Sequence, residues 1–215
     1  MTRRLVQLYG GLVLYGFSMA LMIESSLGLD PWDVLHEGLA KRLPVSFGVV
    51  VIAVGALVLL AWIPLRQRPG LGTVSNVVVI GLAVDASAYV LPEPDAVAVR
   101  ALFLVAGVVL NGVATAAYIG ARFGPGPRDG LMTGLVRTTG QSVRLVRTTI
   151  ELSVLGTGWL LGGTVGIGTV LYAVAIGPLV HLLLPRLTVP ASTTGPADVQ
   201  EGGHGDGRPA GVRPR

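Results

Sequence analysis

The chain has 215 residues, of which 51% are hydrophobic and only 13% are charged, and its formal net charge is +4. A soluble domain of this length would carry about a quarter charged residues, so the composition excludes an ordinary soluble globular protein. Because the sequence contains no cysteine, disulfide bonds and thiolate chemistry are excluded as well. We therefore expect an integral membrane protein, with the lipid bilayer as its first partner.

Six apolar stretches are long enough to cross a bilayer, which requires about 20 residues per helix. In chain order they cover residues 5–23, 45–65, 73–91, 101–121, 145–163 and 169–187. The first stretch follows Arg3 and Arg4 and could be mistaken for a signal peptide. It lacks a cleavage site of the small-x-small type, so we interpret it as a span. Residues 190–215 are rich in Gly, Pro, Ser and Thr, which predicts a disordered cytoplasmic tail.

A segment too short to cross the bilayer follows the first span and begins with GLDPWDVL at residues 28–35. Asp30 is placed to cap a helix, Pro31 fits the first turn, and the Asp33 carboxylate can accept from free backbone N–H groups. Two arrangements stay open. The helix lies at the membrane interface with Trp32 in the aromatic belt, or it is re-entrant and points its N-terminus into a central cavity.

The third span begins with GLGTV at residues 70–74. Gly70 and Gly72 permit a tight turn, and Thr73 can cap the helix that follows. The motif lacks the strand and the full glycine spacing of a phosphate-binding loop, so we favour a structural turn. The alternative is a ligand loop in which the helix dipole favours an anionic group.

The chain repeats itself once, without gaps, at an offset of 96 residues. GLDPWDVL at 28–35 corresponds to GPGPRDGL at 124–131, and GLGTV at 70–74 corresponds to GIGTV at 166–170. Chance matches among small apolar residues do not explain both motifs at one offset, so we infer a duplication. The second copy therefore has its own short helix, with Asp129 in the place of Asp33, and its own helix-start turn at Gly166, Gly168 and Thr169.

Each copy holds three spans, and an odd number means that the two copies enter the membrane from opposite sides. The predicted fold is an all-α polytopic membrane protein of six transmembrane helices. They form two inverted three-helix repeats, residues 1–92 and 93–189, each with a short non-spanning helix after its first span.

Charged residues within spans are costly in hydrocarbon unless they are paired or hydrated, so they are candidate pathway residues. Asp85 in the third span is equivalent to His181 in the sixth. If both lie near the pseudo-twofold axis, the pair could carry a proton or bind a cation at the bilayer midplane. The alternative, which we favour, is that each side chain extends to its own interface.

Arg147 and Glu151 in the fifth span are spaced for an intrahelical ion pair, and Arg144 extends the row. We favour a self-neutralised pair near the cytoplasmic surface. The alternative is an anion-coordinating row that faces Arg128 and Asp129 of the second short helix. With Asp33, Asp129, Asp85 and His181, the residues Arg147 and Glu151 complete the set of candidate pathway residues. Asn76 and Asn111 could form hydrogen bonds between helices.

With six spans and a cytoplasmic N-terminus, every Lys and Arg except Lys41, Arg42 and Arg100 lies on the cytoplasmic side. This agrees with the positive-inside rule and predicts a plasma-membrane protein with both termini cytoplasmic. The topology also explains the net positive charge, so we expect no nucleic-acid partner.

The string GLDPWDVLH at 28–36, followed by GLGT at 70–73, resembles the YczE/YitT family of bacterial integral membrane proteins over residues 4–187. The resemblance implies a multispanning protein of the bacterial plasma membrane and supplies no catalytic residues. The second copy departs from the motif, because Arg128 stands where the first has Trp32 and Met132 where it has His36. Any role of those side chains is therefore not symmetric.

Three functions remain open at this point. The leading one is a small secondary transporter or exporter of an unidentified small solute, with its pathway between the repeats. The others are a substrate-capture subunit of a multicomponent importer and a non-transporting scaffold or regulator. The sequence has no nucleophile elbow, zincin motif or metal-ligand cluster, so we expect no enzymatic activity, cofactor or metal site. Gly158, Gly162 and Gly166 permit close helix packing, within a monomer or a homodimer.

Overall fold

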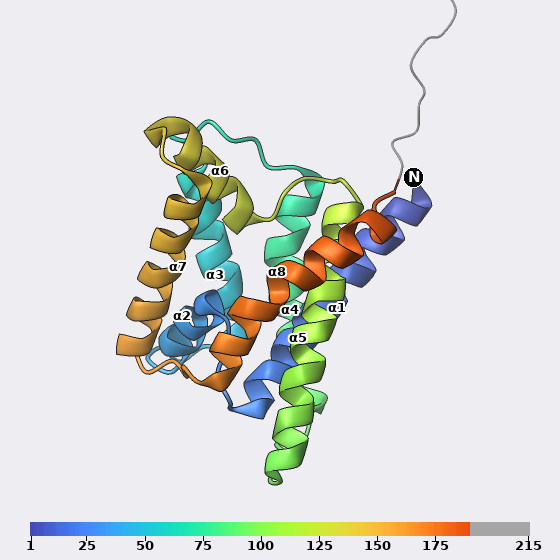
Figure 1. Ribbon diagram of the computed structural model, residues 1–215, viewed down its shortest axis with the longest axis vertical. Coiled ribbons are helices and arrows are strands. Elements are labelled where there is room, and N and C mark those ends of the chain that lie inside the picture. Colours follow the sequence, from blue (N-terminus) through green and yellow to red (C-terminus); the bar gives the residue numbers. More distant parts are fainter. Residues whose placement is uncertain (190–215) are drawn as a thin grey trace, which may run out of the picture.

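The computed structural model describes residues 1–189, and all regular secondary structure in this part of the chain is helical (Figure 1). The all-α prediction is thus confirmed, while the predicted tail at 190–215 lies outside the described residues. In order, the helices are α1 (Thr2–Ser25), α2 (Pro31–Ala40), α3 (Phe47–Ala61), α4 (Leu71–Val90), α5 (Val97–Gly120), α6 (Pro127–Thr139), α7 (Val143–Leu160) and α8 (Ile167–Leu187).

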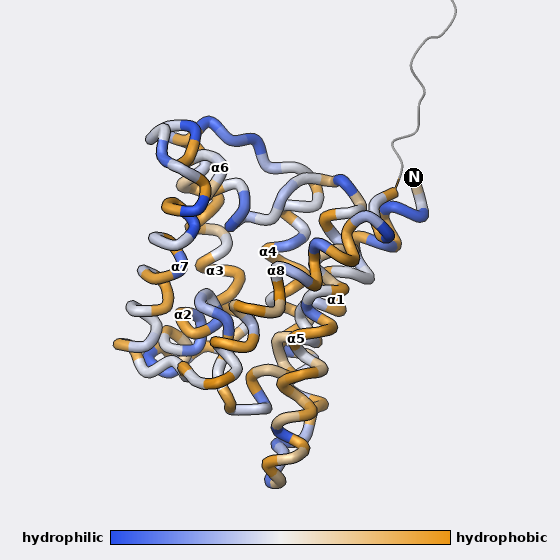
Figure 2. Tube along the Cα trace, viewed as in Figure 1, coloured by the Kyte–Doolittle hydropathy of each residue, from blue (hydrophilic) through white to orange (hydrophobic). Residues whose placement is uncertain are grey.

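Within the described residues, four helices are long and apolar enough to cross a membrane: α1, α4, α5 and α8. They correspond to four of the six predicted spans. The other two stay predictions, because α3 has only 15 residues and α7 carries three charged side chains, Arg144, Arg147 and Glu151. Figure 2 shows hydrophobic residues along the long helices and hydrophilic residues gathered at α6 and the loop beside it.

Helices α1 and α5 pack against each other at the centre, with α4 on the other side of α1 and α8 on the other side of α5 (Figure 1). A buried polar chain crosses this layer. The Asn111 side-chain amide donates to Ser18 Oγ at 3.0 Å, and the Tyr172 hydroxyl donates to Asn111 Oδ1 at 3.0 Å. Asn111 therefore joins α1, α5 and α8, as the sequence predicted for a polar residue in a span.

The short helices α2 and α6 lie toward opposite ends of the molecule, with α3 and α7 running between them (Figure 1). Asp30 caps α2 as predicted, since its side chain accepts from the backbone N–H groups of Trp32 and Asp33. At the other end of α2, Lys41 forms an ion pair with Glu37 at 2.7 Å and donates to the Gly162 carbonyl at 3.0 Å. At the equivalent position before α6, Gly126 provides no side-chain cap.

Both glycine-threonine turns pair with the loop that precedes a short helix. The Gly72 N–H donates to the Phe123 carbonyl at 2.9 Å, and the Gly168 N–H donates to the Leu27 carbonyl at 2.8 Å. Thr73 Oγ1 accepts from the Gly70 N–H, as Thr169 Oγ1 does from Gly166. The turns thus connect the first half of the chain with the second.

Helix α1 offers a test of how tightly this layer packs, because Gly10 and Gly16 lie on the same helix in different surroundings. A methyl group at Gly16 would lie 2.6 Å from Ala83 Cβ and 2.8 Å from backbone atoms of α4, whereas one at Gly10 meets nothing within 4 Å. We expect Gly16→Ala to destabilise the protein by about 1–3 kcal/mol, because α4 must move away.

Gly10→Ala is the control and should leave the melting temperature in mild detergent unchanged or slightly higher, since alanine favours a helix. Equal melting temperatures for the two variants would contradict the close contact between α1 and α4.

Candidate functional site

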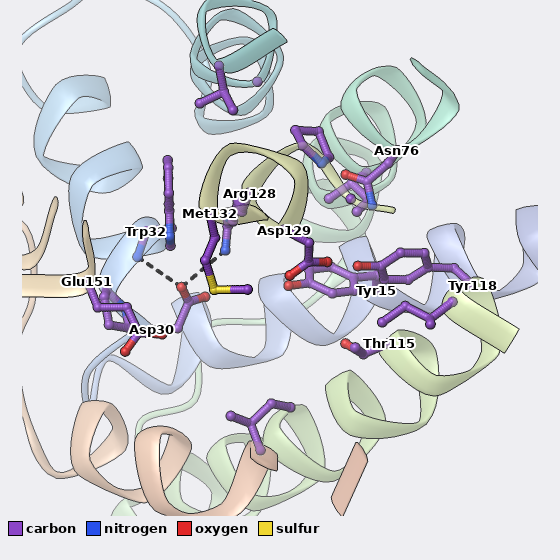
Figure 3. Close-up of a pocket in the computed structure, with 18 of the residues that line it drawn as sticks. Tyr15, Asp30, Trp32, Asn76, Thr115, Tyr118, Arg128, Asp129, Met132 and Glu151 are labelled. Carbon is purple, nitrogen blue, oxygen red and sulfur yellow. Dashed lines mark hydrogen bonds and ion pairs between the residues drawn. The ribbon is translucent and has the colours of Figure 1, made fainter. Parts of the chain in front are cut away.

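A cavity of about 450 Å³ lies between the N-termini of α2 and α6, and all eight described helices contribute side chains to its wall. Figure 3 shows polar residues that converge on this cavity. They are Asp30 at the cap of α2 and Trp32 within α2, Arg128 and Asp129 from α6, Tyr15 from α1, and Tyr118 from α5. Much of the remaining wall is apolar, with residues such as Val51, Val77 and Ile176. This combination is typical of a small-molecule site.

The most polar part of the wall is a cluster of two buried carboxylates and one guanidinium. Arg128 Nη1 lies 3.5 Å from Asp30 Oδ1, and its Nη2 lies 3.6 Å from Asp33 Oδ1 (Figure 3 shows the first contact). The guanidinium carbon lies 4.9 Å from the centre of the Trp32 ring, in cation–π contact. Since Arg128 belongs to α6 and both aspartates to the start of α2, this cluster joins the two short helices.

Asp33, the second aspartate of the cluster, is fully buried. Its Oδ1 is 3.0 Å from His36 Nδ1. Among the described residues, its other oxygen, Oδ2, is buried without a hydrogen-bond partner. A buried oxygen of this kind normally finds a donor, and a proton shared with the neighbouring Asp30 carboxyl group can supply one.

Burial, together with the negative charge of Asp33, raises the pKa of Asp30 to about 8. Burial, reinforced by the positive charge of Arg128, lowers the pKa of His36 to about 3. The imidazole is therefore neutral at pH 7, and within the described part of the chain Arg128 is the cation that contacts both aspartates. We conclude that the aspartate pair carries a proton over much of the neutral range.

The opposite side of the cavity is aromatic. The rings of Tyr15 and Tyr118 meet edge to face with their centres 6.2 Å apart. A side chain added at Gly126 would meet the Tyr118 hydroxyl at 2.9 Å and Asp129 Oδ2 at 3.2 Å, so both groups lie beside the start of α6. The uncapped end of α6 thus already has a carboxylate next to it.

Of the candidate pathway residues predicted from sequence, four line the cavity: Asp129, Arg147, Glu151 and His181. Asp33 does not line it but contacts Arg128, which does. The predicted Arg147–Glu151 ion pair forms, with Nε 2.8 Å from Oε1. The two charges neutralise each other, as the favoured interpretation expected, while the placement of the pair near the cytoplasmic surface stays a prediction.

Asp85 is not paired with His181, so the hypothesis of an Asp–His pair at these positions is corrected. The Asp85 carboxylate accepts from Ser46 Oγ at 2.5 Å and from the Gly48 N–H at 2.7 Å. It therefore binds the N-terminus of α3, where free N–H groups and the helix dipole stabilise a negative charge. His181 lines the cavity from α8 instead.

Sequence reasoning assigned Asp30 only a capping role and missed the three cavity tyrosines, Tyr15, Tyr118 and Tyr172. A phenolic hydroxyl in an otherwise apolar span was the available signal, because such a group needs a partner inside the protein. No local sequence pattern predicts the ion pair between Arg128 and Asp30, since the two residues are 98 positions apart.

A family model described as "Family of unknown function (DUF6198)" matches residues 2–185 of the chain. The chain belongs to this family. It is 34% identical over 180 residues to "Uncharacterized membrane protein YczE" of Bacillus subtilis, which covers 83% of this chain and 84% of that protein. The predicted resemblance to the YczE family is thereby confirmed.

Two further relatives match over similar lengths. An "Uncharacterized protein" of Haemophilus influenzae is 40% identical over 173 residues, covering 80% of this chain and 79% of the relative. "Uncharacterized protein YyaS" of B. subtilis is 26% identical over 182 residues, covering 82% and 90%. No solved structure matches the chain. The YczE relative is named a membrane protein and four helices are apolar enough to span, so this chain is a membrane protein.

Proposed function

We propose that the protein is a small secondary transporter of the bacterial plasma membrane, and that the cavity between α2 and α6 holds its solute. The observation that carries this proposal is the cluster of Asp30, Asp33 and Arg128, which joins the two halves of the chain across the cavity wall. In transporters built from inverted repeats, the solute site lies between the repeats, near the N-termini of interrupted or short helices.

The proposal includes the six-span inverted repeat, with α3 and α7 as the second and fifth spans. In its support, α2 and α6, α3 and α7, and α4 and α8 start at positions that differ by the same 96 residues. Gly28 and Gly124 are also equivalent, with φ angles of 115° and 120°. An ungapped duplication that keeps the same local backbone supports two similarly folded halves.

Reciprocal contacts support a twofold relation between these halves. The Gly72 N–H of the first half donates to the Phe123 carbonyl of the second half. At the equivalent positions, the Gly168 N–H of the second half donates to the Leu27 carbonyl of the first half. At the ends of the short helices, Lys41 donates to the Gly162 carbonyl and Arg137 to the Arg66 carbonyl, again at equivalent positions. Contacts that recur in this exchanged form are typical of a twofold axis. With three spans per copy, that axis lies in the membrane plane.

The absence of cysteine makes a direct test possible, because single cysteines can be introduced without other changes. Asn76→Cys and Thr115→Cys place a thiol in the cavity wall (Figure 3). Val109→Cys, on the outer surface of α5, is the matched control. We expect a membrane-impermeant maleimide to label both cavity thiols in cells or oriented vesicles. Val109→Cys should stay unlabelled, since a thiol in hydrocarbon does not ionise.

Alternating access predicts that the cavity thiols react with reagent applied from either side of the membrane. Labelling from one side alone would support a binding site without transport, and the substrate-capture role would then be preferred. If both cavity cysteines stay as unlabelled as the control Val109→Cys, a water-filled pathway is contradicted and a scaffold role is favoured.

A further inference from the structure

We infer that the solute is a small organic cation with a guanidinium or amine group, and that the Arg128 side chain occupies the cation's place when no solute is bound. This inference rests on the proposed function, because it names the class of solute for the same cavity. It makes Arg128 a tethered counter-ion that an incoming cation displaces.

The charge around the cavity favours a cation. Among residues 1–189, Asp30, Asp33 and Asp129 supply three carboxylates, and Arg128 is the guanidinium in contact with the first two. Arg147 is already paired with Glu151. With one proton on the aspartate pair, its remaining negative charge is balanced by Arg128, and the Asp129 carboxylate adds a negative charge to the cavity wall. An added cation would be attracted, whereas an added anion would be placed among like charges in a region of low dielectric constant.

The contacts of Arg128 outline the site that a free cation would use. Its guanidinium has carboxylates on one side and the face of Trp32 on another, which are the two kinds of group that bind an organic cation in proteins. The ion-pair distances of 3.5 and 3.6 Å are longer than those of a tight charge-assisted bond, at about 2.7–2.9 Å. Arg128 is therefore held loosely.

The cavity also has room for more than a charged group. Its volume of about 450 Å³ is within the usual range for small-molecule sites, and its walls are largely aliphatic and aromatic. A cation with a modest apolar portion would place its charge at the aspartates and its apolar part toward Tyr15, Tyr118 and Ile176. The uncapped N-terminus of α6 does not change this assignment, because Asp129 Oδ2 lies beside it.

The role assigned to Arg128 gives a coupling between the two halves. Arg128 comes from the second half and both aspartates from the first, so a bound cation would replace the ion pairs that join α2 to α6. The two short helices would then be free to separate. A guanidinium is preferred to a plain ammonium as a probe, because its planar fork reproduces the contacts that Arg128 makes.

The test is chemical rescue of Arg128→Ala, measured as the melting temperature of the purified protein in detergent. Removal of the side chain leaves two buried carboxylates without their cation and should lower the melting temperature. Methylguanidinium at ten times its dissociation constant should then raise it by about 3–6 °C. Neutral methylurea, which has a similar shape, should not. Arg137→Ala on the same helix removes an exposed guanidinium that bonds a backbone carbonyl, and it should show no rescue.

Rescue that is absent from Arg128→Ala, or equal with methylurea, would overturn the inference. Stabilisation of the wild type by acetate, lost in Arg128→Ala, would overturn it in favour of an anionic solute. Should Arg128→Ala fail to fold, calorimetric titration of the wild type with phenylguanidinium decides the matter. Binding that Asp33→Asn weakens at least tenfold supports the inference, and absence of binding contradicts it.

Rescue and transport are separate readouts. If methylguanidinium rescues Arg128→Ala but the cavity cysteines are not labelled, the cation site is supported and the transport proposal is contradicted. If the cysteines are labelled but there is no rescue, the transport proposal is supported and the cation site is contradicted.

Discussion

Replacing Trp62 with alanine is expected to lower the free energy of unfolding by about 3–5 kcal/mol. Trp62 follows α3, is 1% exposed, and packs with Trp32 and Val58 in one hydrophobic cluster. Its Nε1–H donates to the Pro127 carbonyl at 3.0 Å, and its ring lies directly against Gly130 of α6. Truncation would therefore leave a large cavity at the contact between α3 and α6 and remove the hydrogen bond from the indole to α6.

Trp159 is the matched control, because it is 65% exposed on α7. Trp159→Ala should change the melting temperature little. Trp62→Phe should lie between the two, since it keeps most of the ring but loses the N–H bond, at a cost of about 1–3 kcal/mol. Similar melting temperatures for Trp62→Ala and Trp159→Ala would contradict the buried contact with α6.

Gly28→Ala should be the second most damaging change, for two reasons that act together. Gly28 has φ = 115°, a conformation that residues with a side chain rarely adopt, and the strain costs about 1–3 kcal/mol. A methyl group there would also lie 2.6 Å from the Gly166 backbone nitrogen and 2.9 Å from Thr169 Oγ1. The turn that connects the loop before α2 to the start of α8 would have to open.

Gly162→Ala separates strain from contact. Gly162 has φ = 100°, but a methyl group there meets nothing within 4 Å. We expect Gly162→Ala to destabilise the protein through backbone strain alone. Gly28→Ala, which adds a steric clash, should therefore lower the melting temperature more than Gly162→Ala does. If the two variants melt together, the close approach of Gly28 to Gly166 does not hold. Gly124→Ala, at the equivalent position of the repeat, should resemble Gly28→Ala.

These two substitutions affect contacts that connect the halves of the chain, and so does the Arg128 cluster. Trp62 and Gly130, Gly28 and Gly166, and Asp30 and Arg128 each pair a residue of the first half with one of the second. Under the proposed transport cycle the first two contacts hold the framework, while the loosely held third one is free to change.

Composition and local patterns were sufficient for the class of the protein and for much of its secondary structure. An apolar chain with few charges must be a membrane protein, and in hydrocarbon its backbone must satisfy its own hydrogen bonds, which favours helices. Helix starts are equally local. Asp30 and Pro31 act on N–H groups within three residues, so α2 begins where they predict. Helices α4 and α8 begin two residues before the predicted starts, with Gly70 and Gly166 at the cap and the threonines at the third helical position.

Only the tertiary structure decided which polar residues meet. Asp85 and His181 are equivalent in the repeat, yet Asp85 binds the N-terminus of α3 because those free N–H groups lie within its reach. Arg128 reaches Asp30 from 98 positions away, and the cavity takes side chains from every described helix. Such contacts depend on how helices pack and cross, which small residues such as Gly16 and Gly130 permit without specifying a partner. The spacing of charges along one helix therefore predicts the Arg147–Glu151 pair. It does not predict a cavity whose wall comes from eight described helices.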